Sequence, residues 1–248
     1  MTTSIRLVET TVKNTSKDAE TFTKTGTTAE RGMIKFPYVM LLALVAISAG
    51  VWFAQWQQAG NKPELEALQA ELENTLVFPD DYKTLPAFQL LNEDGQNIDQ
   101  TSFDQQWSML FFGFTQCPDV CPITLAVLRD ALKLIAEDSP ETSPFEIVFT
   151  SVDPNRDPPE VLKPYISGFN TNVRAMTGEL NDVLGFAKAM NIVVAYNEDE
   201  NDSSHYSVDH TASILLIDPD KKIRAKFNVP HEPDKVASDY IALMSNLQ

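Results

Sequence analysis

Cysteine and histidine are scarce in this 248-residue sequence, which contains two cysteines, Cys117 and Cys121, and three histidines. A disulfide between the two cysteines would close a loop of about one turn and add little stability, so an inert structural bridge is the weakest explanation of the pair. A structural zinc site normally uses four protein ligands, and few candidates are present. The two cysteines are therefore expected to serve chemistry.

Basic residues are also scarce outside the N-terminus. Lys and Arg number 19 against 35 Asp and Glu, which gives a formal net charge of −16. Residues 1–35 carry six basic and four acidic side chains and residues 36–54 carry neither, so the remainder holds 13 basic and 31 acidic side chains, a charge of −18. Such an acidic surface repels nucleic acid and anionic lipid and favours cationic ligands or partners with a basic face. Nucleic-acid binding is therefore excluded.

Residues 36–54 form a long stretch without a charged side chain. As a helix these residues would span about 28 Å, which is close to the thickness of the hydrocarbon core of a bilayer. Arg31 and Lys35 precede the stretch and the first cation after it is Lys62, so the positive-inside rule places the N-terminus in the cytoplasm. The sequence predicts a single uncleaved transmembrane helix at residues 36–54 and a disordered cytoplasmic tail at residues 1–35.

Other uses of the apolar stretch are less favoured. A cleaved signal peptide would end in small residues, whereas Val51, Trp52 and Phe53 continue the apolar run. A lipoprotein anchor needs a cysteine directly after the run, and none stands there. A mitochondrial transit peptide would be poor in acidic residues, unlike residues 1–35. We therefore expect a bacterial inner-membrane protein whose C-terminal domain lies in the periplasm.

A domain at residues 79–248 is expected to follow a spacer at residues 55–78. The spacer contains a short amphipathic helix whose apolar face is formed by Leu65, Leu68, Leu72 and Leu76. That face predicts a spacer helix between the anchor and the domain. Alternatively, the helix could form a coiled coil with a second copy of the chain, so a homodimer is possible.

Within the domain, apolar runs of strand length alternate with helical patterns. The predicted strands are residues 87–91, 97–98, 108–114, 145–152, 173–176, 192–196, 212–217 and 223–227. The predicted helices are residues 123–136, 159–169, 180–190 and 233–247. Alternation implies parallel strands, and the last two strands add an antiparallel edge. This pattern predicts an α/β, thioredoxin-like fold of three layers with a mixed central sheet.

Cys117 and Cys121 occur in Cys-Pro-Asp-Val-Cys-Pro, where the predicted strand at residues 108–114 gives way to a helix. If the helix opens at Asp119, the i, i+4 spacing brings both sulfurs to one face. The unpaired N–H groups of a helix N-terminus favour thiolate over thiol. Because a thiolate is both a nucleophile and a metal ligand, the spacing leaves redox chemistry and metal binding open.

His210 lies directly before the predicted strand at residues 212–217. A lone histidine is usually an ordinary surface or core residue. However, a loop that enters a strand antiparallel to residues 108–114 would lie at the same sheet edge as the cysteines, where ligands gather. His205 and His231 lie in acidic stretches and are expected to be solvated, with His205 as a reserve ligand.

Asp153, Arg156 and Lys163 follow the predicted strand at residues 145–152. Asp153 precedes a proline and is expected to fix a turn; the alternative is that it shapes the rim facing Cys117. Arg156 and Lys163 are rare cations in an acidic domain. They could contact an acidic partner, although isolated surface cations need no special role.

Three blocks of sequence resemble the Sco/SenC family of copper-handling proteins. The first is Gly-Phe-Thr-Gln-Cys-Pro-Asp-Val-Cys-Pro at residues 113–122, and the second is Ser-Val-Asp-Pro-Asn-Arg-Asp-Pro-Pro-Glu at residues 151–160. The third is Asp-His-Thr at residues 209–211, followed by Leu-Ile-Asp-Pro at residues 216–219. The blocks stand in the family's order, and the predicted anchor agrees with it. Together they are far more specific than two cysteines four residues apart.

The resemblance implies a thioredoxin-like fold in which Cys117, Cys121 and His210 coordinate one copper. It implies a metallochaperone rather than an enzyme, which delivers Cu(I) to the dinuclear copper A centre of cytochrome c oxidase subunit II. The alternative is a membrane-anchored thiol–disulfide oxidoreductase that reduces the cysteines of that copper centre, with Cys117 attacking and Cys121 resolving. Family members often carry His where this chain has Gln116, which is not one of the three ligands.

The ligand chemistry agrees with copper. Two soft thiolates and one imidazole suit Cu(I), and a three-coordinate site leaves an open face for transfer. Zinc is the rival metal and would need a fourth ligand from His205, His231, Asp119 or Asp209. The two acids are expected instead to support or cap the site.

Overall fold

The computed structural model describes residues 36–59, 62–72, 74–169, 172–199 and 202–247. The chain divides into two compact units, Met1–Phe53 and Ala54–Gln248. Helix α1 (Phe36–Ala59) covers the stretch that the sequence predicts to be an anchor. None of the described helices is both long enough and apolar enough to cross a membrane. The structure therefore does not confirm the transmembrane helix, and the predicted tail at residues 1–35 lies outside the described residues.

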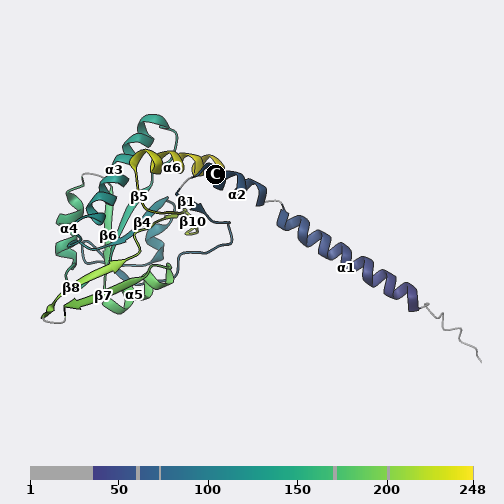
Figure 1. The fold of residues 1–248 in the computed structure, drawn as a ribbon, viewed down its shortest axis with the longest axis horizontal. Coiled ribbons are helices and arrows are strands. Elements are labelled where there is room, and N and C mark those ends of the chain that lie inside the picture. The colour runs from purple at the N-terminus through teal and green to yellow at the C-terminus, as the bar shows by residue number, and fades with distance from the viewer. Residues whose placement is uncertain (1–35, 60–61, 73, 170–171, 200–201, 248) are drawn as a thin grey trace, which may run out of the picture. The chain divides into compact units, whose positions relative to one another are not determined.

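The second unit is organised around an eight-stranded sheet (Figure 1). Its strands run in the order β1 (Thr75–Val77), β10 (Ile223–Phe227), β9 (Ile214–Ile217), β4 (Ser108–Gly113), β5 (Glu146–Ser151), β6 (Val173–Thr177), β2 (Leu90–Asn92) and β3 (Asn97–Ile98). The β4–β5 and β5–β6 pairs are parallel and the other pairs are antiparallel. The sheet is therefore mixed, as predicted, but β10 is not an edge because β1 pairs along its outer side.

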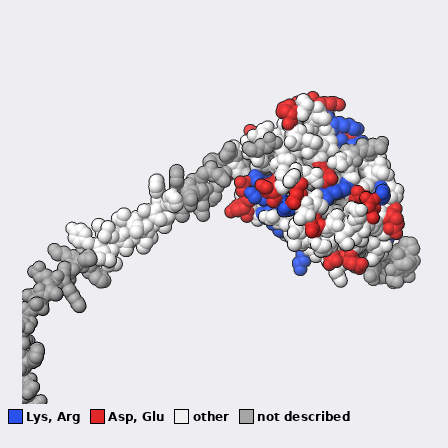
Figure 2. Space-filling view, turned by 180° about the vertical axis from the view of Figure 1, so that it is seen from behind, with Lys and Arg blue, Asp and Glu red and all other residues white. Residues whose placement is uncertain are grey.

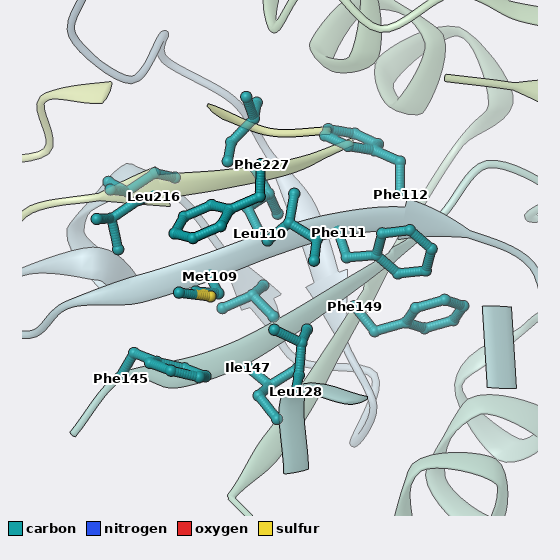
Figure 3. Packing of buried hydrophobic residues seen from close by; sticks show 14 of the residues in the cluster. Met109, Leu110, Phe111, Phe112, Leu128, Phe145, Ile147, Phe149, Leu216 and Phe227 are labelled. Atoms are coloured by element: carbon teal, nitrogen blue, oxygen red, sulfur yellow. The ribbon is translucent and has the colours of Figure 1, made fainter. Parts of the chain in front are cut away.

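Strand β4 lies in the middle of the sheet because its residues are apolar on both faces. All six of its residues are buried, which is typical of a strand covered on both sides. Phe111 pairs with Phe149 of parallel β5 on one side and with Ile214 of antiparallel β9 on the other. Figure 3 shows the Phe111 and Phe149 rings next to each other in this core, with centroids 6.2 Å apart.

Helices cover both faces of the sheet, which confirms the three predicted layers (Figure 1). Helices α3 (Val120–Asp138), α4 (Pro159–Ser167) and α6 (Pro233–Leu247) lie on the face that carries Phe149, whose ring contacts Tyr165 of α4. Helix α5 (Leu180–Ala189) lies on the opposite face, where Phe186 contacts Phe112, and the short 3₁₀ helix η1 (Gln100–Phe103) lies there too.

The sequence does not predict the hairpin formed by β7 (Val194–Asp199) and β8 (Asp202–His210). These strands pair antiparallel in a separate two-stranded sheet that extends away from the main one (Figure 1). The predicted strand at residues 192–196 is thus part of a hairpin and not of the central sheet. Strand β8 escapes prediction because it is largely polar and lacks an apolar run.

The segment predicted to be a spacer contributes to the domain core. Helix α2 (Lys62–Glu71) buries Leu68, and Leu72 is buried directly after it. The Gln69 side chain donates to the Thr75 carbonyl at 2.8 Å and accepts from the Val77 N–H at 2.9 Å, which ties α2 to β1. Leu76 is in β1 and exposed rather than on the helix face. Because Leu68 and Leu72 pack within their own chain, they are not available to a dimerising coil.

Candidate metal centre

The Cys117–Cys121 segment lies where central strand β4 ends and α3 begins. Helix α3 starts at Val120, so Cys121 is in its first turn and Cys117 is in the preceding loop rather than on the same helix. The two cysteines therefore do not form the predicted i, i+4 pair on one helix. Instead, the Cys121 N–H donates a hydrogen bond to the Cys117 sulfur at 3.4 Å. An N–H of the first helical turn, which has no partner within the helix, therefore donates to Cys117 Sγ.

Cys121 is fully buried beneath this loop, whereas Cys117 is half-buried. Both cysteines are free thiols. Burial is the main reason that the pKa of Cys121 is raised, and its hydrogen bond with Cys117 raises it further. The Cys121 sulfur thus keeps its proton until a metal or a reaction partner replaces it.

His210, the last residue of β8, reaches the same point from a distant part of the chain. Its Nε2 lies 3.7 Å from Cys121 Sγ, and its Nδ1 lies 3.2 Å from the Thr211 carbonyl oxygen. Because that carbonyl can only accept, Nδ1 carries the proton and the Nε2 lone pair faces the sulfur. Burial lowers the pKa of His210, which keeps the ring neutral and able to bind a metal.

The separation of sulfur and nitrogen fits two ligands of one metal ion. With metal–sulfur and metal–nitrogen bonds of about 2.3 and 2.0 Å, as for zinc, ligands 120° apart would be about 3.7 Å from each other. The observed distance from Cys121 Sγ to His210 Nε2 is 3.7 Å. Within the described ranges, however, no three His, Cys, Asp or Glu side chains form a complete metal-binding group. The structure therefore brings the three predicted residues together in pairs, Cys117 with Cys121 and Cys121 with His210.

Two of the other residues that could have completed a zinc site, Asp209 and His231, have hydrogen-bond partners elsewhere. The Asp209 side chain accepts a hydrogen bond from Asn197 at 2.7 Å. Asp119 is exposed at the N-cap of α3 but makes no capping hydrogen bond with its side chain. The prediction that His231 is solvated is wrong, because its Nε2 lies 2.9 Å from the Ala212 carbonyl oxygen. His205 belongs to β8, but its side chain lies outside the described part of the chain.

A surface hollow of about 430 Å³ gives access to the cluster. Cys117 and His210 both line it, together with Gln116, Arg156 and Tyr206. A metal held between the sulfurs and the imidazole would therefore be reachable from solvent at one side only, because Cys121 is completely buried.

Comparison with known proteins identifies the family. Residues 79–245 match the family model described as SCO1/SenC. The chain belongs to the SCO1/SenC family. Its mixed α/β fold is the thioredoxin-like fold of that family, as the sequence predicts.

Individual Sco relatives agree with this assignment. A protein of Stutzerimonas stutzeri, named as a candidate copper-binding protein, is 31% identical over 162 residues, which cover 65% of this chain and 76% of that protein. The copper-bound structure of Arabidopsis thaliana ScoI has a TM-score of 0.61 and 27% identity, covering 67% of this chain and 100% of the other. Copper-bound ScoI of Bradyrhizobium japonicum has a TM-score of 0.56 and 29% identity, covering 64% and 98%.

Asp157 is a residue of the Sco fold whose role the sequence does not reveal. Its carboxylate is fully buried and accepts hydrogen bonds from the Thr115 N–H at 2.8 Å, from the Thr115 hydroxyl and from the Ser151 hydroxyl at 2.6 Å. Burial raises its pKa, and these hydrogen bonds partly offset that effect. The loop that carries Cys117 is therefore attached, through Asp157, to Ser151 at the end of β5.

Asp153, Arg156 and Tyr206 together hold the hairpin that carries His210. The buried Asp153 carboxylate pairs with Arg156 and accepts from the Tyr206 hydroxyl at 2.6 Å. The Arg156 guanidinium lies 3.9 Å from the centre of the Tyr206 ring and donates to the Tyr206 carbonyl at 3.1 Å. Asp153 thus fixes a turn, as predicted, and also attaches β8 to β5, and Arg156 is engaged inside the protein instead of being a free surface cation.

Proposed function

We propose that this Sco protein binds Cu(I) through Cys117, Cys121 and His210 and delivers it to the dinuclear copper A centre of cytochrome c oxidase subunit II. The observation that carries the proposal is the 3.7 Å contact between Cys121 Sγ and His210 Nε2, made by residues 89 positions apart in the sequence. The copper-bound structures of two relatives support the choice of metal. Another solved protein, BsSco, is described as a member of the Sco family of cytochrome c oxidase assembly proteins, and membership of the same family supports the choice of recipient.

The chemistry of the three side chains explains how copper could be both held and released. Two thiolates and a neutral imidazole are soft and intermediate ligands that suit Cu(I). The metal is cargo here, so the site must let it go. Cys117 and His210 face the 430 Å³ hollow, where ligands of an acceptor could replace them one at a time, whereas Cys121 stays buried.

A thiol–disulfide oxidoreductase is the second candidate, because one cysteine is accessible and the other is buried. The Cys117 thiolate would attack a target disulfide to give a mixed disulfide, and Cys121 would displace the target as a dithiol. The target gains two electrons and two protons, and the Cys117–Cys121 pair becomes a disulfide. The oxidase copper centre has its own cysteines, so both activities would serve one recipient.

Substitution of His210 distinguishes the two functions. For the full chain, His210→Ala is expected to weaken Cu(I) binding by at least about 100-fold, because a ligand is lost and not merely its support. Competition with a chromophoric Cu(I) chelator under reducing conditions measures this. Thiol–disulfide exchange of the same variant with a model disulfide is expected to continue, because no step of that reaction uses the imidazole.

His205→Ala is the matched control, since it removes a histidine from the same strand. It is expected to bind Cu(I) as the wild type does. Near-stoichiometric copper in purified His210→Ala protein would contradict the copper-carrier proposal. Failure of the reduced wild-type protein to bind Cu(I) would leave only the oxidoreductase.

We propose a location at the bacterial inner membrane, with the C-terminal domain in the periplasm, from the sequence alone. The support is the uncharged stretch at residues 36–54 and the cations directly before it. Cell fractionation combined with protease treatment of spheroplasts tests the proposal. Degradation of the C-terminal domain from outside is expected, and its protection would contradict the orientation.

A further inference from the structure

The hydrogen bonding of the β7–β8 hairpin changes at its base, directly beside His210. Val194 pairs with His210 there, so Val193 and Thr211 lie opposite each other one position further. Two residues in a hydrogen-bonded pair of an antiparallel ladder exchange two bonds, each N–H donating to the other residue's carbonyl. The Thr211 N–H does donate to the Val193 carbonyl at 3.0 Å. The return bond differs, because the Val193 N–H donates to the side-chain hydroxyl of Thr211 at 3.1 Å.

The Thr211 hydroxyl thus takes the place of the Thr211 carbonyl in the ladder. In a regular ladder that carbonyl would be directed across the hairpin at the opposing N–H of Val193. Its oxygen instead lies 3.2 Å from Nδ1 of His210, the residue before it. Because the hydroxyl satisfies the Val193 N–H, the carbonyl is free to accept a hydrogen bond from the imidazole.

Packing alone does not decide which nitrogen of His210 faces the cysteines. The imidazole packs against Phe111 and Phe114, with ring centroids 6.2 and 6.1 Å away and interplanar angles of 72° and 86°. These contacts confine the plane of the ring, but a half-turn about its Cβ–Cγ bond keeps that plane and exchanges Nε2 with Cε1. The bond from Nδ1 to the Thr211 carbonyl selects the orientation in which Nε2 lies 3.7 Å from Cys121 Sγ.

We propose that Thr211 is a positioning residue for His210: its hydroxyl accepts the Val193 N–H and so releases the Thr211 carbonyl to hold the imidazole with Nε2 toward Cys121. This role deepens the proposed function and rests on its use of His210 as a copper ligand. A histidine that binds a metal usually donates its other N–H to a carboxylate, a carbonyl or water, which fixes its tautomer and orientation. In this chain a side chain makes the required carbonyl available.

Two substitutions separate the hydroxyl of Thr211 from the shape of its side chain. Threonine is branched at Cβ, which suits an extended backbone, and its hydroxyl can bond to nearby backbone groups. Thr211→Val keeps the branch and loses the hydroxyl, whereas Thr211→Ser keeps the hydroxyl and loses the branch. If the hydroxyl is what matters, serine rescues the function and valine does not.

The tautomer of His210 is measured without copper, by nuclear magnetic resonance of the reduced full chain with isotope-labelled histidine nitrogens. The spectrum is simple because the chain has three histidines, and His210→Ala identifies the signals of His210. At about pH 8, where imidazoles are neutral, the wild type and Thr211→Ser are expected to carry the His210 proton on Nδ1. Thr211→Val is expected to lose this pattern, because the carbonyl returns to the Val193 N–H and releases the ring.

Cu(I) affinity is measured for the same proteins by chelator competition. Thr211→Val is expected to bind Cu(I) about 10- to 100-fold more weakly, the range observed when the partner of a metal-binding histidine is lost. Thr211→Ser is expected to bind as the wild type does. The melting temperature of Thr211→Val is expected to stay close to that of the wild type, because the lost hydrogen bond is exposed to solvent.

Asn197→Ala is the matched control, because it also removes a hydrogen bond between the two strands of the hairpin. The Asn197 side chain donates to the Asp209 carboxylate at 2.7 Å and takes no part in the Val193–Thr211 pair. This variant is expected to keep the wild-type tautomer of His210 and the wild-type Cu(I) affinity.

Retention of the Nδ1 proton in Thr211→Val would overturn the positioning role. Its loss in Thr211→Ser would show that the branch and not the hydroxyl matters, and its loss in Asn197→Ala would show a general loosening of the hairpin; either result also overturns the role. The copper proposal fails separately: wild-type protein that binds no Cu(I), together with a tautomer that depends on the Thr211 hydroxyl, would refute copper carriage and support the positioning role.

Discussion

At the scale of single residues, Gly113 determines whether Cys121 can occupy its buried position. Gly113 ends β4, and the space beside its Cα is taken by the Cys121 sulfur and the Phe149 ring. An added Cβ would lie 2.8 Å from Cys121 Sγ and 2.7 Å from Phe149 Cε2, closer than such atoms approach each other. The absence of a side chain at this position therefore makes room for the sulfur.

Gly113→Ala is expected to lower the free energy of unfolding by about 1–3 kcal/mol, because the core must shift to accept the methyl group. The displaced sulfur is also expected to weaken Cu(I) binding. Urea unfolding and chelator competition measure the two effects.

Gly185→Ala is the control for this variant, because a Cβ at Gly185 in α5 would meet no atom within 4 Å. Alanine is the better helix former by about 1 kcal/mol, so this change is expected to stabilise the protein. A Gly113→Ala protein as stable as the wild type would show that the core tolerates the methyl group.

At the scale of elements, the β7–β8 hairpin delivers His210 to the cysteines. The hairpin pairs with no strand of the main sheet within the described part of the chain. Its attachment near the site comes from side chains instead: Tyr206 bonds to Asp153, and the Tyr196 hydroxyl donates to the Val152 carbonyl. Burial and the Asp153 charge raise the pKa of Tyr206 to about 12, so its hydroxyl remains a donor.

Tyr206→Phe is expected to loosen the hairpin, because the buried Asp153 carboxylate loses a 2.6 Å hydrogen bond. Hydrogen bonds to charged groups contribute about 1.5–3 kcal/mol, and a loss in this range is expected in urea unfolding. Cu(I) affinity is expected to fall as well, since His210 ends the same strand.

Tyr82→Phe provides the comparison, because the Tyr82 hydroxyl bonds to Asn191, which lies outside β7 and β8. Tyr82 stacks on Phe78, and its hydroxyl accepts a long hydrogen bond of 3.5 Å from Asn191. This variant is expected to behave as the wild type in both measurements. Unchanged Cu(I) affinity in Tyr206→Phe would mean that the hairpin is held by other contacts.

At the scale of the whole molecule, the domain core is larger than the region that carries the motifs. The family match begins at residue 79, yet Leu68, Leu72 and Val77 are buried before it. Acidic residues outnumber basic ones in the domain, and Figure 2 shows acidic and basic side chains interspersed among uncharged ones on the face it presents. The hydrophobic core therefore includes residues that precede the family match.

A fragment of residues 79–248 is therefore expected to be less stable than one of residues 54–248. The shorter fragment loses β1 from its pairing with β10 and three buried apolar side chains, each worth roughly 1.5–3 kcal/mol. Urea unfolding of the two fragments measures the difference, with the full chain as reference. Equal stability would mean that residues 54–78 are a spacer after all.

The sequence was sufficient to predict those features that depend on neighbouring residues. The continuous apolar run at residues 108–114 predicts a strand buried on both faces, and β4 is one. The period of leucines after Cys121 predicts α3, and the apolar run at residues 223–227 predicts β10. The two cysteines are close in space because they are close in the chain.

Only the tertiary structure decided the contacts between distant segments. It placed His210 Nε2 at 3.7 Å from Cys121 Sγ and paired residues 194–199 with residues 202–210 in a hairpin. Hydrophobic periodicity reports whether a residue faces the core but not which residue it meets there. Those contacts are set by the packing of whole elements, so the sequence could indicate His210 as a ligand but only the folded chain shows which of its atoms approaches which sulfur.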